Sequence, residues 1–241
     1  MSSIVPFTSE TPFDKVLADI REKGWSITDG LFSGEMVEAL MSDISDLDNS
    51  YMKQAGVGRS LDHQVALERR RDYIRWIDPV NPARSAFLNA MGELRLEFNR
   101  RLFLGLWDYE AHFARYEEGA FYEKHLDAFK GKSNRVLSTV LYLNENWEEG
   151  DGGEFVLFDE NDEHKELGRF HPKKGRLAVF LSEEFPHEVL KAKRTRHSIA
   201  GWFRVNNNIQ NNLEEGILWQ GIGKSRREVR QCDRAGLRSF G

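Results

Sequence analysis

Three stretches in the first hundred residues carry apolar side chains at the three- and four-residue spacing of amphipathic helices. These apolar stripes lie in residues 13–20, 37–47 and 87–102. Thr11, Ser33 and Asn81 precede the stripes, and each of these side chains can cap a helix. We therefore expect three helices, the first of which ends at Gly24. Residues 25–29 alternate between apolar and polar side chains, which predicts a short strand after the first helix.

Beyond Gly105 the pattern changes to short runs typical of β-strands, separated by turn residues. The runs are residues 111–116, 120–126, 135–143, 153–158, 176–181, 187–190 and 196–205. Many short strands at close spacing indicate a sandwich or barrel, so the predicted fold class is mainly β with flanking helices. Because the chain shows no internal repeat and no linker, we predict a single domain, 1–241. Helical support occupies residues up to about 105, the β core about 106–206 and a tail about 207–241.

Two segments do not fit this pattern. Residues 54–75 contain Gly56 and Gly58, many charges and little periodicity, which predicts a long loop or a β-finger. Long loops in compact domains are often functional. The tail after Asn212 is rich in lysine and arginine and is expected to be a solvated helix or a frayed terminus.

Composition narrows the function classes. The 241 residues are 40 % hydrophobic with a net charge of −5, which excludes wholesale disorder and argues against nucleic acid or an anionic membrane as partner. No apolar run is long enough to span a membrane, and the first residues lack the features of a signal peptide. Cys232 is the single cysteine, which excludes an internal disulfide and indicates the cytoplasm. Any metal must therefore be held by histidine and carboxylate.

One candidate for such a metal site is the pair His125 and Asp127. Residues two apart in a strand point to the same side, so the pair can offer a nitrogen and an oxygen to one ion. This short motif is common by chance, but His187 follows in a later β-run. Two histidines and one carboxylate form the facial triad of non-haem iron oxygenases, which leaves metal positions open for reactants.

Arg196 is the second candidate functional residue. In a strand it shares one face with Ser198, Ala200 and Trp202. A guanidinium among small and apolar neighbours needs an anionic partner, and its planar fork suits a carboxylate.

Together these residues complete a pattern found in a known family. Residues 116–204 resemble the iron(II)/2-oxoglutarate-dependent dioxygenases, and most of all their prolyl 4-hydroxylase branch, typified by the oxygen-sensing hypoxia-factor hydroxylases and their bacterial relatives. The resemblance rests on residues 125–127, 140–147, 152–153 and 186–203. Trp76 resembles the strand that follows the mobile finger of that branch. The implied fold is a double-stranded β-helix with a jelly-roll core.

The resemblance also implies roles for individual residues. These are iron ligation by His125, Asp127 and His187, 2-oxoglutarate binding by Arg196, Tyr142 and Tyr116, and substrate binding or lining of the active site by Tyr122, Trp202, Arg71 and Asp72. Asp72 would pair with a nearby arginine. The implied cofactor is Fe(II), with 2-oxoglutarate and O2 as co-substrates, and ascorbate is left open as an accessory reductant.

The implied reaction hydroxylates a proline in a protein substrate and releases succinate and CO2. Halogenating relatives lack the acid at the position of Asp127, so its presence favours hydroxylation. Residues 54–75 would form a mobile finger that closes over the protein substrate. Hydroxylation of a free amino acid or small metabolite remains an alternative. A non-catalytic sensor is disfavoured by the complete triad with Arg196, and a zinc hydrolase is disfavoured because nothing suggests a general base.

Overall fold

The computed structural model describes residues 11–47, 49–55, 70–129, 131 and 133–206. In these ranges the three expected helices are α1 (Asp14–Lys23), α2 (Gly34–Ser45) and α3 (Pro82–Leu102). The Oγ atom of Ser33 accepts the N–H of Met36 at 3.2 Å, so this residue caps α2 as predicted. Asn81 caps α3 in the same way. Thr11 does not cap α1, because its hydroxyl donates to the carboxylate of Asp14, the first residue of the helix.

The described strands form two antiparallel sheets. The major sheet has the order β1 (Trp25–Thr28), β9 (Leu177–Leu181), β6 (Arg135–Tyr142), β11 (Arg196–Arg204), β4 (Asp108–Tyr116), β3 (Asp72–Trp76) and β2 (Lys53–Gln54). The minor sheet has the order β5 (Tyr122–His125), β10 (His187–Val189), β7 (Phe155–Phe158) and β8 (Glu166–Phe170). The described residues also include the short 3-10 helices η1 (Asn49–Tyr51) and η3 (Glu149–Asp151). The predicted mainly β fold with flanking helices is confirmed.

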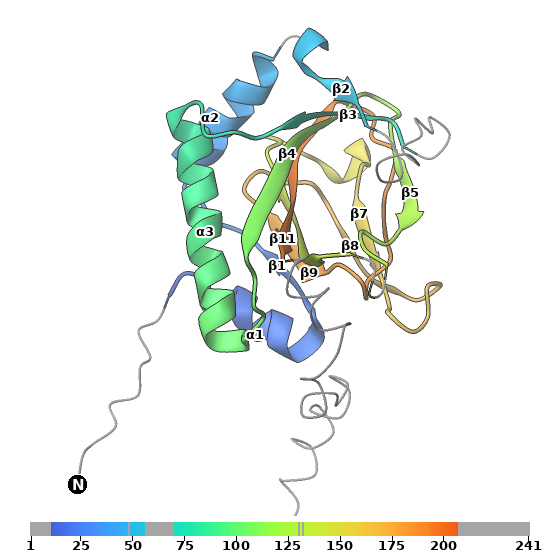
Figure 1. Ribbon diagram of the computed structural model, residues 1–241. Helices are drawn as coiled ribbons and strands as arrows, with labels where there is room; N and C mark the ends of the chain where they lie inside the picture. The colour runs from blue at the N-terminus through green and yellow to red at the C-terminus, as the bar shows by residue number, and fades with distance from the viewer. Residues whose placement is uncertain (1–10, 48, 56–69, 130, 132, 207–241) are drawn as a thin grey trace, which may run out of the picture. The chain divides into compact units, whose positions relative to one another are not determined.

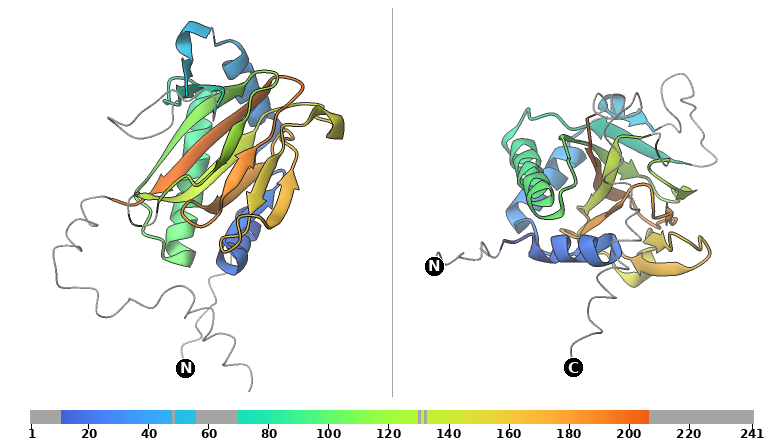
Figure 2. Two further views of the ribbon diagram at one scale, coloured as in Figure 1. Left: turned by 90° about the vertical axis from the view of Figure 1, so that its right-hand side faces the viewer. Right: turned by 60° about the horizontal axis from the view of Figure 1, so that its bottom comes forward.

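Apolar side chains pack between the sheets and between the major sheet and the helices. Across the inner space, the ring centroid of Phe155 in β7 lies 5.5 Å from that of Phe180 in β9. On the outer face of the major sheet, Phe98 of α3 packs edge-on against Phe203 of β11. Figures 1 and 2 show α3 along this outer face, on the side away from the minor sheet. Side chains alternate along a strand, so β11 can pack one face on α3 and turn the other toward the minor sheet.

The sequence did not predict β8. Its side chains are exposed or half-buried, as expected for a strand at the edge of the minor sheet, so it lacks the apolar pattern of an inner strand. Pairing with β7 makes Glu166–Phe170 a strand. β4 also begins earlier than predicted, at Asp108.

The expected finger begins and ends in strands. Lys53 pairs with Ile74 and Gln54 with Tyr73, so β2 and β3 run antiparallel at its base. Residues 56–69 and the predicted basic tail, 207–241, lie outside the described residues.

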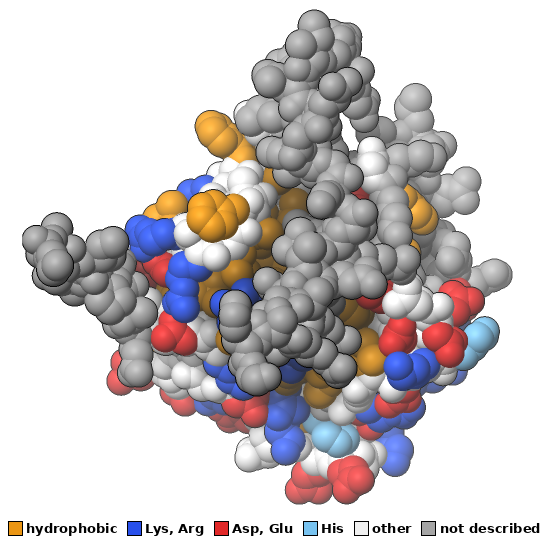
Figure 3. Space-filling view, turned by 90° about the horizontal axis from the view of Figure 1, so that it is seen from below, with side chains coloured by type: hydrophobic (Ala, Val, Ile, Leu, Met, Phe, Trp, Pro, Cys, Tyr) orange, Lys and Arg blue, Asp and Glu red, His pale blue; other side chains and the backbone are white. Residues whose placement is uncertain are grey.

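Among the helices that the structure describes, none is long and apolar enough to cross a membrane. On the face seen in Figure 3, acidic and basic side chains are interspersed.

Candidate active site

A cavity of about 50 Å³ lies between the inner faces of the two sheets. Among the residues that line it are nine predicted site residues: Asp72, Tyr116, Tyr122, His125, Asp127, Tyr142, His187, Arg196 and Trp202. They come from strands of both sheets and from the bend after β5. The fold therefore brings together side chains that are up to 130 residues apart in sequence, from Asp72 to Trp202.

The triad forms where β5 pairs with β10. His125 and His187 are directly opposite in this pair, and their ring centroids lie 4.3 Å apart. β5 ends at His125, so Asp127 lies in the following bend rather than in the strand. The carboxylate of Asp127 lies 3.7 Å from Nε2 of His125 and 3.8 Å from Nε2 of His187. Three potential ligand atoms, one from each residue, lie within 4.8 Å of one another.

Backbone carbonyls orient both imidazoles. Nδ1 of His125 donates to the carbonyl of Glu123 at 2.7 Å, and Nδ1 of His187 donates to that of Phe185 at 3.1 Å. Because a carbonyl only accepts, each Nδ1 carries a proton, which leaves Nε2 as the ring atom that faces Asp127 and is available to a metal. Metal-binding histidines are commonly held in this way.

The protonation states of the triad also suit a metal. Burial lowers the pKa of His187 to about 4, so its imidazole is neutral near pH 7. Burial acts to raise the pKa of Asp127, but the two histidines and a hydrogen bond with Ser138 lower it well below its usual value. A neutral imidazole and an ionised carboxylate are the forms that ligate a metal, and two nitrogens with one oxygen fit Fe(II).

Arg196 lines the cavity and is 2 % exposed. It pairs with Tyr116 across β11 and β4, and its Cζ atom lies 4.2 Å from the centroid of that ring. One Nη donates to the carbonyl of Gly153, but its Nε and the hydroxyl of Tyr142 are buried without a hydrogen-bond partner among the described residues. Burial raises the pKa of Tyr142 to about 12, so its hydroxyl keeps a proton to donate. Unpaired buried donors beside a guanidinium fit a carboxylate ligand such as 2-oxoglutarate.

Asp72 pairs with an arginine as predicted, and the structure identifies Arg70 as its partner. The two form a bidentate ion pair, with N···O distances of 2.5 and 2.8 Å, and Asp72 is fully buried. The guanidinium of Arg70 lies 4.6 Å from the ring centroid of Tyr122, which stacks on His125 at 3.5 Å. The ion pair therefore contacts the triad through one aromatic ring.

The resemblance gives Arg71 a role in binding substrate or lining the active site, and the structure places it outside the cavity. Arg71 is exposed, with its guanidinium 5.3 Å from the ring of Phe121, and it does not line the cavity. Arg70 lines the cavity instead, because Arg70 forms an isolated bridge with Tyr122 of β5. The sequence marked this region through Asp72 and its expected arginine partner, but it did not show which arginine that partner is.

His112 has no role among the predicted site residues, but it lines the cavity. It is buried between Trp76 and Trp202, at centroid distances of 5.3 and 5.5 Å. Burial lowers its pKa to about 4, so the ring is neutral near pH 7. In the sequence, His112 lies an even number of positions before the predicted site residue Tyr116. In a strand this spacing puts both side chains on the same face of β4.

We expect Asp72→Asn to destabilise the fold by about 3 kcal/mol, because it leaves the buried guanidinium of Arg70 without its counter-charge. Urea-induced unfolding measures this loss. The control is Glu38→Gln, which breaks a surface ion pair with Lys174 and should cost less than about 1 kcal/mol. Equal effects of the two substitutions would contradict a structural role for the buried pair.

Proteins of known structure are similar to this chain in fold and in amino-acid sequence. Residues 111–204 match the family model of the 2OG-Fe(II) oxygenase superfamily. The crystal structure of a prolyl-4-hydroxylase from Pseudomonas putida is 42% identical, covers 79% of this chain and 97% of that chain, and superposes with a TM-score of 0.71. The chain therefore belongs to the 2OG-Fe(II) oxygenase superfamily, in its prolyl hydroxylase branch. The predicted double-stranded β-helix is confirmed, and Fe(II), 2-oxoglutarate and O2 are the family's cofactor and co-substrates.

Two more distant relatives are also similar to this chain. A prolyl hydroxylase from Trichoplax adhaerens, solved in complex with a hypoxia inducible factor oxygen degradation domain peptide fragment, is 23% identical. It covers 83% of this chain and 90% of that chain, with a TM-score of 0.71. A hypoxia-inducible factor prolyl hydroxylase from Caenorhabditis elegans is 26% identical over 203 residues, 79% of this chain. The chain spans 28% of the length of that curated relative.

Proposed function

We propose that this protein hydroxylates a proline residue in a protein substrate, using Fe(II), 2-oxoglutarate and O2 and releasing succinate and CO2. The observation that carries the proposal is a triad of two imidazoles and a carboxylate in the same cavity as a buried, incompletely paired arginine. The 42% identity with the Pseudomonas putida prolyl-4-hydroxylase supports proline as the target. The peptide bound to the Trichoplax relative supports a protein rather than a free amino acid as substrate.

In this proposal His125, Asp127 and His187 hold the iron, each through the atom that faces the other two. When bound, the iron supplies the oxidising chemistry that couples decarboxylation of 2-oxoglutarate to hydroxylation. The carbonyls of Glu123 and Phe185 keep both Nε2 lone pairs directed into the site.

In the same cavity, Arg196 pairs with the distal carboxylate of 2-oxoglutarate, and Tyr142 donates its hydroxyl to the same group. Tyr116 supports Arg196 through its ring face. The apolar ring of Phe155 lines the wall beside His187, which excludes water from the reacting atoms. These residues therefore bind and orient the co-substrate.

The substrate proline enters on the side of Trp202, Tyr122 and the Arg70–Asp72 pair, which also line the cavity. Arg71 lies outside the cavity, so its predicted contact is with the surface of a protein substrate.

We also propose that the protein acts in the cytoplasm, which its single cysteine supports. Its proposed partner is this protein substrate and not nucleic acid, in keeping with a net charge of −5.

The proposal is tested by mass spectrometry of the host proteome with and without the enzyme. We expect added oxygen on proline in a restricted set of proteins, and peptides from those sites should stimulate conversion of 2-oxoglutarate to succinate. Conversion that is stimulated by a free amino acid and by no peptide would contradict the proposal and favour a small-molecule substrate.

A further inference from the structure

The inner face of the major sheet continues beyond the active site to the sheet edge. Strand register places Tyr142, Ser198, Ala114, Ile74 and Lys53 in one row across β6, β11, β4, β3 and β2. Directly paired residues of antiparallel strands point to the same face. The row therefore leads from the proposed co-substrate site to Lys53, which is exposed on the last strand of the sheet.

A neighbouring row carries aromatic side chains in the same direction. In this row Ala200 pairs with His112, and His112 pairs with Trp76. Trp76 contacts the cavity-lining His112 edge-on at 5.3 Å and lies 6.4 Å from Trp202, yet its side chain is 49% exposed. Trp76 thus contacts two cavity-lining side chains on one side and is open to solvent on the other.

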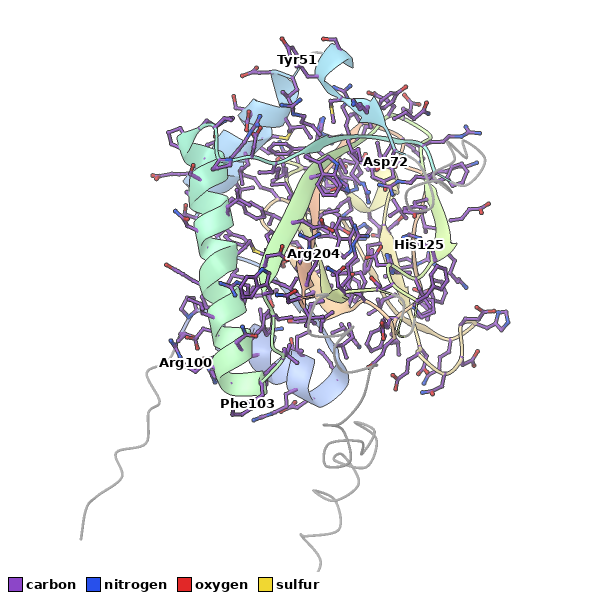
Figure 4. The ribbon with its side chains drawn as sticks, in the orientation of Figure 1. Tyr51, Asp72, Arg100, Phe103, His125 and Arg204 are labelled. Carbon is purple, nitrogen blue, oxygen red and sulfur yellow. The ribbon has the colours of Figure 1, made fainter. Side chains whose placement is uncertain are left out.

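On the outer side of Trp76 lies a groove of about 270 Å³, distinct from the active-site cavity. Its apolar lining consists of Ile74, Trp76, Ile77 and Tyr51, and Tyr51 is 60% exposed. Figure 4 places Tyr51 at the top of the view above Asp72, with His125 lower and to the right. Exposed aromatic rings beside a catalytic cavity are typical of binding surfaces.

The charges at this groove are not balanced. Asp78 is bound by the guanidinium of Arg84 at 2.7 Å and lies 3.9 Å from Arg75, so its negative charge is already matched. Lys53 also lines the groove and forms no ion pair with another described residue. Lys53 therefore favours an acidic group in an occupant of the groove.

We propose that this groove binds, in extended form, the stretch of the protein substrate beside the target proline, with an apolar side chain against Tyr51 and Trp76 and a carboxylate at Lys53. This inference rests on the proposed function.

Neighbouring strands lie about 4.8 Å apart, so the three steps from β11 to β2 cover about 14 Å. An extended chain rises about 3.3 Å per residue, which places the acidic residue about four positions from the proline.

The test uses a library of synthetic peptides, each with a single central proline and randomised residues on both sides. The full-length enzyme acts on the library with Fe(II), 2-oxoglutarate and ascorbate, and mass spectrometry identifies the hydroxylated members. We expect aspartate and glutamate to be enriched about four positions from the proline, on one side of it.

Charge reversal then assigns the preference to Lys53. Two peptides that differ only by glutamate or lysine at the enriched position are compared by kcat/KM. We expect Lys53→Glu to shift the ratio of the two values by about 10-fold in favour of the lysine peptide, because attraction and repulsion exchange places. Peptide-independent conversion of 2-oxoglutarate should stay unchanged.

Matched controls separate this effect from changes in net charge or in surface hydrophobicity. Lys173→Glu, at an exposed lysine on the loop between β8 and β9, should leave the ratio as in the unmodified enzyme. Tyr51→Ala should raise KM for both peptides, whereas Trp107→Ala, at another exposed aromatic residue, should not.

The possible outcomes test the groove assignment and the proposed function separately. Hydroxylated peptides without an acidic preference, or a preference that Lys53→Glu leaves intact, would overturn the groove assignment and leave the proposed function standing. Absence of any hydroxylated peptide, together with no stimulation of 2-oxoglutarate conversion, would overturn the proposed function and the groove with it.

Discussion

His187→Ala is expected to abolish 2-oxoglutarate turnover. The substitution removes one of three clustered ligand atoms. Losing a residue that only orients a metal ligand typically costs about 10- to 100-fold in activity or metal affinity, so losing the ligand itself should cost more than about 100-fold. Measurements of Fe(II) binding and of succinate formation on the same samples check this expectation.

Two further variants make that result specific. His187 is buried between Phe155 and Phe180, so its removal also costs packing, and circular dichroism must show a retained fold. Asp127→Ala removes a ligand that is less tightly enclosed and should give the same loss. His164→Ala, at an exposed histidine, should leave turnover unchanged. Fe(II)-dependent succinate formation that survives in His187→Ala would contradict the triad.

Arg196→Ala is expected to weaken 2-oxoglutarate binding far more than Fe(II) binding. The guanidinium is buried, and its Nε lacks a partner among the described residues. Loss of a buried charge pair with a carboxylate costs about 2–5 kcal/mol, or roughly 30- to 5,000-fold in affinity. Calorimetric titration of the metal-loaded protein with 2-oxoglutarate measures the change.

Arg196→Lys tests whether charge alone accounts for this binding. An ammonium cannot reproduce the two parallel donors of a guanidinium, so we expect only partial recovery. Arg194→Ala is the control, because Arg194 precedes Arg196 by two residues but is largely exposed. An unchanged 2-oxoglutarate affinity in Arg196→Ala would assign the carboxylate to another residue.

Local patterns in the sequence determined most elements and much of the site. The caps at Ser33 and Asn81 and the apolar stripes that follow them predicted α2 and α3, since a helix is stabilised by contacts three and four residues apart. Strand alternation placed Arg196 and Trp202 on one face, and both line the cavity. The resemblance to the dioxygenases rested on short motifs in the same strands, so it was readable before any tertiary contact was known.

Only the tertiary structure decided how the strands pair. His125 and His187 become opposite neighbours through the register of β5 and β10, which joins residues 62 positions apart in the chain. Pairing with β7 likewise makes β8 a strand although its sequence lacks an apolar pattern. A single strand does not encode its partner, because register depends on which faces are buried in the finished fold.

The same reason explains which site residues the sequence did not distinguish or did not reveal. Arg70 and Arg71 are adjacent and chemically identical, and only the bridge between Arg70 and Tyr122 brings Arg70 to the cavity. His112 became a site residue through its position between Trp76 and Trp202, on neighbouring strands of the assembled sheet. The sequence thus determined which side chains can perform the chemistry, whereas long-range pairing decided which of them share the cavity.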